Sequence, residues 1–267
     1  MKAYELLVWT DDMVKKYWDY EAQFPKNFFT YSRSYEIIRQ IKSHLPRNCT
    51  VLDYGCGPGN LIGPLLEAGF RVAGLDTSSS ARQLVANRFG NDKDFLGSFN
   101  QSEINSSGLQ FDAIIVAEVI EHLYDEQLDS LLTTLKTLST PETRIIFTTP
   151  NEEKLEDSYI MCPVSGQLFH RWQHVRNWSQ ASVRSYLDFR NFTVITSLTT
   201  DFDASFITRG KKTPAAPVVA LPAVQTEVPG TPGQKAATHG RHRPAGSCQH
   251  MTGAVLWGYF CHQRFLV

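Results

Sequence analysis

The chain has 267 residues, of which 42% are hydrophobic and 20% charged, and its formal net charge is −1. The charge is uneven: 20 basic and 26 acidic residues precede residue 210, a net charge of −6. Such a length allows one α/β domain of roughly 200 residues with an appendage. An acidic region of this kind is a poor surface for a polyphosphate backbone, so nucleic acid is not expected as a partner.

Membrane and export signals are missing from the sequence. No window approaches the ~18 apolar residues of a spanning helix, and residues 1–12 lack the basic and apolar regions of a signal peptide. The five cysteines are scattered and odd in number, which favours reduced thiols over a disulfide framework. We therefore expect a soluble, cytoplasmic protein that does not contact a membrane.

Two helices, over residues 11–23 and 33–45, are predicted before the first strand, and they make residues 9–45 a candidate lid. Aromatic side chains crowd the connection between them. We expect most of these to pack on a sheet, with Phe29 or Tyr31 as the alternative that covers a bound ligand, because binding residues concentrate on loops.

Residues 51–60 read as a buried strand that enters a glycine-rich turn and opens a helix near Asn60. Gly55 and Gly57 can take positive φ and carry no Cβ, so a ligand can lie against the main chain at a helix N-terminus. Asp53, just before them, would repel a pyrophosphate and suits a cationic ligand. A dinucleotide-binding turn would show Gly-x-Gly-x-x-Gly without this acid, so a dinucleotide oxidoreductase is disfavoured.

The next strand is predicted over residues 71–76, followed by a helix over 78–89 and a short third strand over 94–98. Asp76 therefore lies at the tip of the second strand of a βαβ unit, where its carboxylate can accept hydrogen bonds from ribose hydroxyls. An acidic turn residue without a ligand is the alternative.

Residues 111–123 read as a fourth buried strand running into a long helix from Glu118 to about residue 138. On such a helix Glu118, Glu121 and His122 lie at i, i+3 and i+4 and share one face. The acids could simply offset the helix dipole beside a packed histidine. Alternatively, Glu118 contacts cofactor or substrate and His122 is the general base for a hydroxyl nucleophile.

Three more elements are predicted: a fifth strand over residues 143–149, a helix over 179–190 and a sixth strand over 192–197. Strands and helices thus alternate along the chain, which predicts an open, mostly parallel sheet. The loops after strands four and five rim the same crevice. We therefore expect His174, in the second of these loops, to point toward His122.

The sequence from 210 to 253 is rich in proline, alanine and glycine and is predicted to be a disordered insertion or linker. Residues 254–264 are again apolar and are predicted as the last, antiparallel strand. A C-terminal extension that never joins the sheet is the alternative.

Together, the Asp-x-Gly-x-Gly-x-Gly turn, the acid after the second strand and the fourth strand resemble class I S-adenosylmethionine-dependent methyltransferases. The resemblance implies a Rossmann-like α/β fold with a seven-stranded sheet of order 3-2-1-4-5-7-6 and helices on both faces. It also implies S-adenosylmethionine as cofactor and a hydroxyl or amine of a small-molecule or glycan-like acceptor as substrate. The cofactor contacts it implies are Asp53, Tyr54, Gly55, Gly57, Gly59, Asp76, Gly97, Ser98, Ala117 and Glu118.

The pattern Glu-x-x-Glu-His resembles metal-dependent small-RNA 2′-O-methyltransferases and also occurs in ubiquinone-pathway-like O-methyltransferases. The first resemblance implies Glu118, Glu121, His122 and His174 as metal ligands, but Leu123 replaces a histidine that usually follows. We expect no metal, with His122, His174 and Glu118 as the catalytic residues. A metal-dependent RNA enzyme and a non-catalytic S-adenosylmethionine-binding protein remain the alternatives.

Overall fold

The structure is a computed structural model that describes residues 4–200, 202 and 264–266. The chain divides into two units, residues 1–207 with 261–267, and residues 208–260. All described residues belong to the first unit. The predicted insertion over 210–253 and nearly all of the predicted strand over 254–264 lie outside them.

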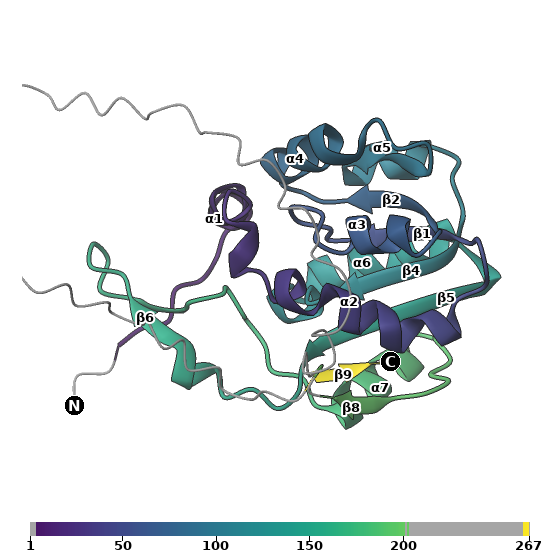
Figure 1. Cartoon of the computed structure of the whole chain (residues 1–267). Coiled ribbons are helices and arrows are strands. Elements are labelled where there is room, and N and C mark those ends of the chain that lie inside the picture. Colours follow the sequence, from purple (N-terminus) through teal and green to yellow (C-terminus); the bar gives the residue numbers. More distant parts are fainter. Residues whose placement is uncertain (1–3, 201, 203–263, 267) are drawn as a thin grey trace, which may run out of the picture. The chain divides into compact units, whose positions relative to one another are not determined.

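A seven-stranded sheet forms the centre of the first unit, in the order β3-β2-β1-β4-β5-β9-β8 (Figure 1). Strands β1 to β5 pair in parallel, and β9 pairs antiparallel with both β5 and β8. With β8 and β9 as the sixth and seventh strands, the predicted Rossmann-like class and strand order are confirmed. The strands are β1 (Thr50–Tyr54), β2 (Arg71–Leu75), β3 (Phe95–Phe99), β4 (Phe111–Ala117), β5 (Ser139–Pro150), β8 (Leu198–Thr200) and β9 (Arg264–Leu266).

Helices cover both faces of the sheet because successive strand residues point to opposite sides. Val51 of β1 joins an apolar cluster with α2, α3 and α4, whereas Leu52 joins the cluster with α5, α6 and α7. Within the described residues no helix is both long and apolar enough to cross a bilayer. The helices are α1 (Asp11–Glu21), α2 (Phe29–Ile41), α3 (Ile62–Glu67), α4 (Ser79–Phe89), α5 (Gln101–Ser106), α6 (Asp125–Leu138) and α7 (Gln180–Phe189).

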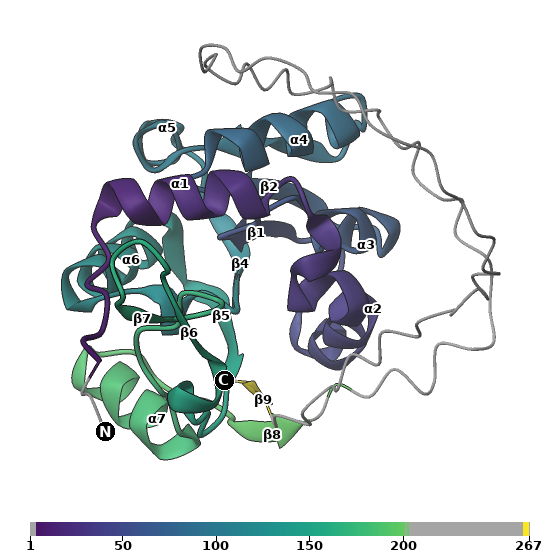
Figure 2. The same cartoon turned by 90° about the vertical axis from the view of Figure 1, so that its left-hand side faces the viewer.

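Helix α1 lies on the side of the sheet toward which the β2 arrow points, and Figure 2 shows it from the front. None of its residues is fully buried, and both ring contacts of Trp18 and polar contacts join it to the rest of the domain. Asp19 accepts a hydrogen bond from the Ser78 hydroxyl at 2.6 Å, and the Tyr17 hydroxyl donates to the Arg171 carbonyl at 2.6 Å. The helix thus bridges the loop after β2 and the loop before α7.

A short hairpin of β6 (Tyr159–Met161) and β7 (Leu168–His170) was not predicted from the sequence. The N-terminal segment extends it, because the Leu7 amide donates to the Leu168 carbonyl at 2.8 Å. This hairpin places His170 beside the carboxyl edge of the large sheet.

Three predicted elements are wrong in their boundaries. The second helix runs over Phe29–Ile41, and residues 42–44 tighten into a 3₁₀ turn instead of continuing it. The sixth strand begins only at Leu198, because Phe192 and Val194 pack on the apolar core without pairing in the sheet. The helix predicted from Glu118 begins at Asp125, as described with the site.

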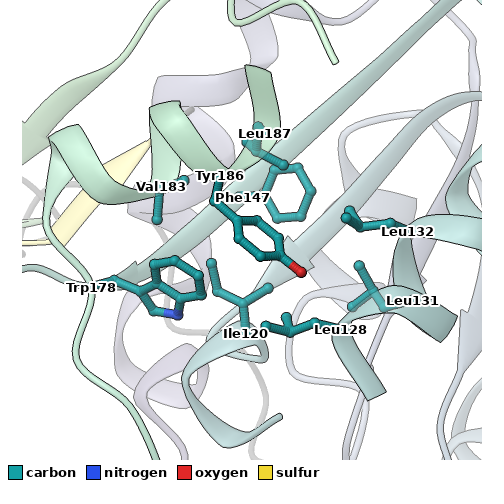
Figure 3. A pocket seen from close by; sticks show the side chains of 9 residues that line it. All are labelled: Ile120, Leu128, Leu131, Leu132, Phe147, Trp178, Val183, Tyr186 and Leu187. Carbon is teal, nitrogen blue, oxygen red and sulfur yellow. The ribbon is translucent and has the colours of Figure 1, made fainter. Parts of the chain in front are cut away.

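Figure 3 shows a small apolar pocket between β5, α6 and α7. Its free space, about 10 Å³, is no larger than one water needs, so it is a packing gap within the core. The Ile120 side chain enters it and anchors the turn that carries Glu121 and His122. The lining residues are Ile120, Leu128, Leu131, Leu132, Phe147, Trp178, Val183, Tyr186 and Leu187.

Gly59→Ala and Gly69→Ala form a matched pair, since both glycines have positive φ, +80° and +86°. A Cβ on Gly69 meets nothing within 4 Å, so its alanine bears only the left-handed backbone cost of about 1–2 kcal/mol. A Cβ on Gly59 would lie 2.9 Å from both Val85 and Phe89, which adds about 1–3 kcal/mol. Urea unfolding should rank the midpoints as wild type, Gly69→Ala, then Gly59→Ala. Equal midpoints for the two variants would contradict this packing.

Candidate active site

The glycine turn after β1 is hydrogen-bonded to the end of the neighbouring strand β2. Gly55 and Gly57 have φ of +74° and +49°. The Gly55 and Cys56 amides both donate to the carbonyl of Leu75, at 2.7 and 2.9 Å. The turn is therefore fixed to the end of β2 before any ligand arrives.

Asp76 joins this turn to the start of α4. One carboxylate oxygen accepts the Gly57 amide and the other accepts the Ser78 amide, each at 2.8 Å. Burial raises the pKa of Asp76, although these two hydrogen bonds oppose the shift. The predicted place of Asp76 at the tip of β2 is therefore what the structure shows, and its contact with a ribose remains a prediction.

Asp53 is the second-last residue of β1, just before the glycine turn, and its carboxylate is buried, with 2% of the residue exposed. Among the described residues its Oδ2 has no hydrogen-bond partner. Burial, and then the nearby charge of Asp76, raise the pKa of Asp53 to about 8. A buried acid without a donor is costly, and a cation placed beside it would favour its ionised form.

These features fit S-adenosylmethionine. The glycine turn exposes main chain, Asp76 offers carboxylate oxygens, and Asp53 offers a buried charge to a cationic molecule. A Cβ on Gly57 would lie 3.1 Å from the Phe28 ring, so Phe28 covers this turn, while Phe29 packs against the core as most of these aromatics were expected to do.

The other predicted cofactor residues lie along the same edge of the sheet. Gly97 and Ser98 are on β3, which pairs with β2, and Ala117 ends β4 beside β1. The Tyr54 hydroxyl donates a hydrogen bond to the Gln101 side chain. Burial, and to a smaller extent the charge of Asp76, raise the pKa of Tyr54 to about 12. Their contacts with the cofactor stay predictions.

The segment after β4 is not the predicted helix. Glu118 has a φ of +55° and its amide donates to the Thr148 carbonyl at 2.9 Å, which draws it toward β5. A 3₁₀ turn, Ile120–His122, follows, and α6 starts at Asp125. Glu118, Glu121 and His122 therefore do not share one α-helical face.

Threonine hydroxyls at the end of β5 hold the two glutamates. Thr148 donates to Glu118 Oε1 and Thr149 donates to Glu121 Oε2, each at 2.9 Å. Glu121 is only 1% exposed. The sequence predicted both acids but not the threonines that orient them.

His122 and His174 meet although 51 residues separate them in sequence. Their ring centroids lie 4.8 Å apart. One ligand atom from each, with a Glu121 oxygen, forms a set whose members lie within 4.8 Å of one another, and Glu118 is outside this set. Burial, and then His174, lower the pKa of His122 well below its usual value, so its imidazole is neutral. The predicted approach of His174 to His122 is confirmed.

Glu153 and His170 were missed by the sequence analysis. Glu153 Oε2 contacts Nδ1 of His174, and its Oε1 lies 3.4 Å from Nε2 of His170. Burial raises the pKa of Glu153, but hydrogen bonds from His170 and His174 outweigh it and lower the pKa below its usual value. The only available signal was the four-residue spacing of the two histidines, which is weak without a partner in view.

Trp18 of α1 connects the histidines to the glycine turn. Its ring lies 4.9 Å from that of His122 and 5.8 Å from that of Phe28, the residue that covers Gly57. Its indole N–H donates to the Gln173 side chain at 2.9 Å. A Cβ on Gly55 would also lie 2.5 Å from Val119, so the turn directly borders the segment before His122. The cofactor-type turn and the histidine pair are therefore adjacent.

A doubly wound sheet with an acid-flanked glycine turn at its carboxyl edge defines the class I S-adenosylmethionine-dependent methyltransferases. The sequence model of the family described as "Methyltransferase domain" matches residues 29–197, more than half of the chain. The chain belongs to this methyltransferase domain family.

Curated relatives include ubiquinone biosynthesis O-methyltransferases. The one from Dinoroseobacter shibae is 28% identical over 150 residues, which cover 55% of this chain and 58% of the relative. The one from Ruegeria sp. (strain TM1040) is 26% identical over 183 residues, covering 63% and 72%. The chain therefore spans little more than half of the length of the first of these enzymes.

Solved structures share the fold. Magnesium protoporphyrin IX methyltransferase from Synechocystis PCC 6803 has a TM-score of 0.53 at 18% identity, covering 72% of this chain and 93% of that one. The glycopeptide N-methyltransferase MtfA has a TM-score of 0.51 at 16% identity, covering 63% and 84%. At these identities the likeness concerns the fold alone.

Cofactor affinity should depend on pH through Asp53. The cationic cofactor favours the ionised carboxylate, whereas the cofactor-free protein holds it protonated below its pKa of about 8. Binding then releases a proton, so affinity should rise up to about tenfold per pH unit toward pH 8 and level off above it. Titration calorimetry with S-adenosylmethionine across this range measures the slope.

Asp53→Asn should weaken binding and abolish this slope, and Asp188→Asn, at an exposed position on α7, should leave both unchanged. A slope that persists in Asp53→Asn would assign the proton to another group and remove Asp53 from the cofactor site.

Proposed function

We propose that this protein transfers a methyl group from S-adenosylmethionine to a hydroxyl group of a small-molecule acceptor. The observation that carries this proposal is the pair His122 and His174, which meets at the carboxyl edge of the sheet beside the glycine turn. The name of the curated relatives, O-methyltransferases, supports a hydroxyl acceptor. The acidic surroundings favour an acceptor without a polyphosphate backbone.

When bound, the cofactor supplies an electrophilic methyl group on a sulfonium. A hydroxyl is a weak nucleophile until its proton is removed, so the protein needs a base beside it. His174 is the better candidate, since a carboxylate holds one of its ring nitrogens while the other keeps a lone pair. His122, buried and neutral, orients the acceptor next to this base.

In this proposal Glu118 is a residue that contacts the cofactor and positions it. A non-glycine residue with positive φ is strained, and such strain is concentrated at functional sites. The hydroxyl of Thr148 holds its carboxylate at the end of β4, next to Ala117 and the glycine turn. We assign it to contact with the cofactor.

His174→Ala should lower kcat about 10²–10⁴-fold while leaving the S-adenosylmethionine dissociation constant unchanged, because it removes the base and not the cofactor contacts. The assay follows label from methyl-labelled S-adenosylmethionine into a panel of phenolic and aliphatic hydroxyl compounds. His44→Ala, at an exposed histidine outside the site, is the control. Full turnover by His174→Ala would refute its role as base.

A divalent metal at Glu121, His122 and His174 is the second candidate for activating the hydroxyl. The observation in its favour is that their ligand atoms lie within 4.8 Å of one another. One carboxylate and two imidazoles form a donor set that suits zinc and other transition metals. Such an ion would lower the pKa of a coordinated hydroxyl and replace the base.

Metal removal separates the two candidates. If His174 is the base, dialysis against EDTA should leave methyl transfer to the panel compounds unchanged, and metal analysis of the purified protein should find less than one ion per chain. Loss of transfer after EDTA that is restored by Zn²⁺, Mn²⁺ or Mg²⁺ would instead establish the metal-dependent mechanism.

A further inference from the structure

The buried carboxylate of Glu153 faces ring nitrogens of two stacked histidines, His170 and His174. It is 6% exposed, and each of its oxygens faces a ring nitrogen of a different histidine. The rings of His170 and His174 stack on each other at 4.3 Å with an interplanar angle of 16°. The proposed methyl transfer does not use His170, and Glu153 enters it only through its contact with His174.

The backbone fixes where His170 carries its proton. Its Nδ1 accepts the amides of Trp172 and His174, both at 3.2 Å, so this nitrogen holds a lone pair and no hydrogen. The ring proton is therefore on Nε2, which lies 3.4 Å from Glu153. This Nε2–H lies close to the carboxylate but makes no hydrogen bond of good geometry among the described residues, so the contact of His170 with Glu153 is electrostatic.

The ring proton of His174 can be placed from its contacts in the same way. Its Nδ1 contacts the second oxygen of Glu153, and an ionised carboxylate only accepts hydrogen bonds. The proton of His174 must then sit on Nδ1, which leaves the lone pair on Nε2. A carboxylate that binds one ring nitrogen in this way sets both the tautomer and the orientation of an imidazole.

We propose that Glu153 is the positioning residue of the site: it fixes His174 in the Nδ1–H tautomer, while its other oxygen lies against the Nε2 side of His170. The proposal rests on the proposed function, in which His174 removes a proton through Nε2. It adds Glu153, in the loop that follows β5, as a residue that acts on the base without contacting the acceptor.

Glu153→Gln is the sharpest substitution, because it keeps the shape of the side chain but replaces one acceptor oxygen by an N–H₂ donor. His170 can only donate, so it takes the remaining oxygen. The amide N–H₂ then faces Nδ1 of His174 and requires a lone pair there, which moves the ring proton to Nε2. Glu153→Asp keeps two acceptor oxygens and is the matched control.

The test is the tautomer of His174, read from long-range ¹H–¹⁵N correlations in the full-length, ¹⁵N-histidine-labelled chain, with its eight histidines assigned by comparison with His174→Asn. The expected result is Nδ1–H in the wild type and in Glu153→Asp, and Nε2–H in Glu153→Gln, with unchanged S-adenosylmethionine affinity in all three. Nε2–H in the wild type, or an unaltered tautomer in Glu153→Gln, would overturn the proposal.

The wild-type spectrum decides the matter even if Glu153→Gln does not fold. This test is also independent of methyl transfer. If His174→Ala retains turnover while the tautomer is as expected, the base assignment fails and the positioning by Glu153 stands. If His174→Ala loses turnover but its wild-type ring carries the proton on Nε2, the positioning fails and the need for His174 stands.

Discussion

The parallel pairing of β4 with β1 on one side and β5 on the other is the constraint on which the site depends. Tyr54 pairs with Val116, and Ala117 pairs with Thr148, so all three strands end at the same edge. The glycine turn, the Glu118–His122 segment and the two threonines are thereby brought together. Because helices cover both faces of these strands, the apolar clusters on the two sides hold the strand ends in place.

Charge separates the two halves of this edge. The half beside the glycine turn, called the cofactor half here, contains the carboxylates of Asp53 and Asp76, whose pKa values are both raised by burial. The other half contains His122, whose pKa is lowered by burial, and the Glu153 carboxylate, which is hydrogen-bonded to His174 and lies 3.4 Å from His170. This distribution of charge agrees with the proposed function, in which a sulfonium cofactor binds beside Asp53 and an uncharged acceptor binds beside the histidines. Burying Asp53 with one oxygen unpartnered costs the protein free energy, and a cation placed beside it would reduce this cost.

The sequence was sufficient for the sheet and for the cofactor half, because both depend on local signals: apolar runs that end in glycine, proline or an acid. The sequence was insufficient for the other half of the edge, which contains His122, His170 and His174. Helical spacing continues from Glu118 into α6, yet the Glu118 amide bonds to the Thr148 carbonyl and Gln127 caps α6 through the Tyr124 amide. Trp18, Glu153 and Gln173 act through contacts between distant segments, and no periodicity encodes such contacts. His174 was predicted only because strand topology brings its loop to the same edge.

Hydrogen–deuterium exchange with and without S-adenosylmethionine tests the central claim most directly, namely that the cofactor binds in the acid-flanked turn that borders the histidine pair. The account predicts slower exchange in residues 55–60 and 76–81 and in the 117–122 segment, and unchanged exchange in α7. Unchanged exchange in the glycine turn at saturating cofactor, or protection confined to α7 and β8, would contradict it.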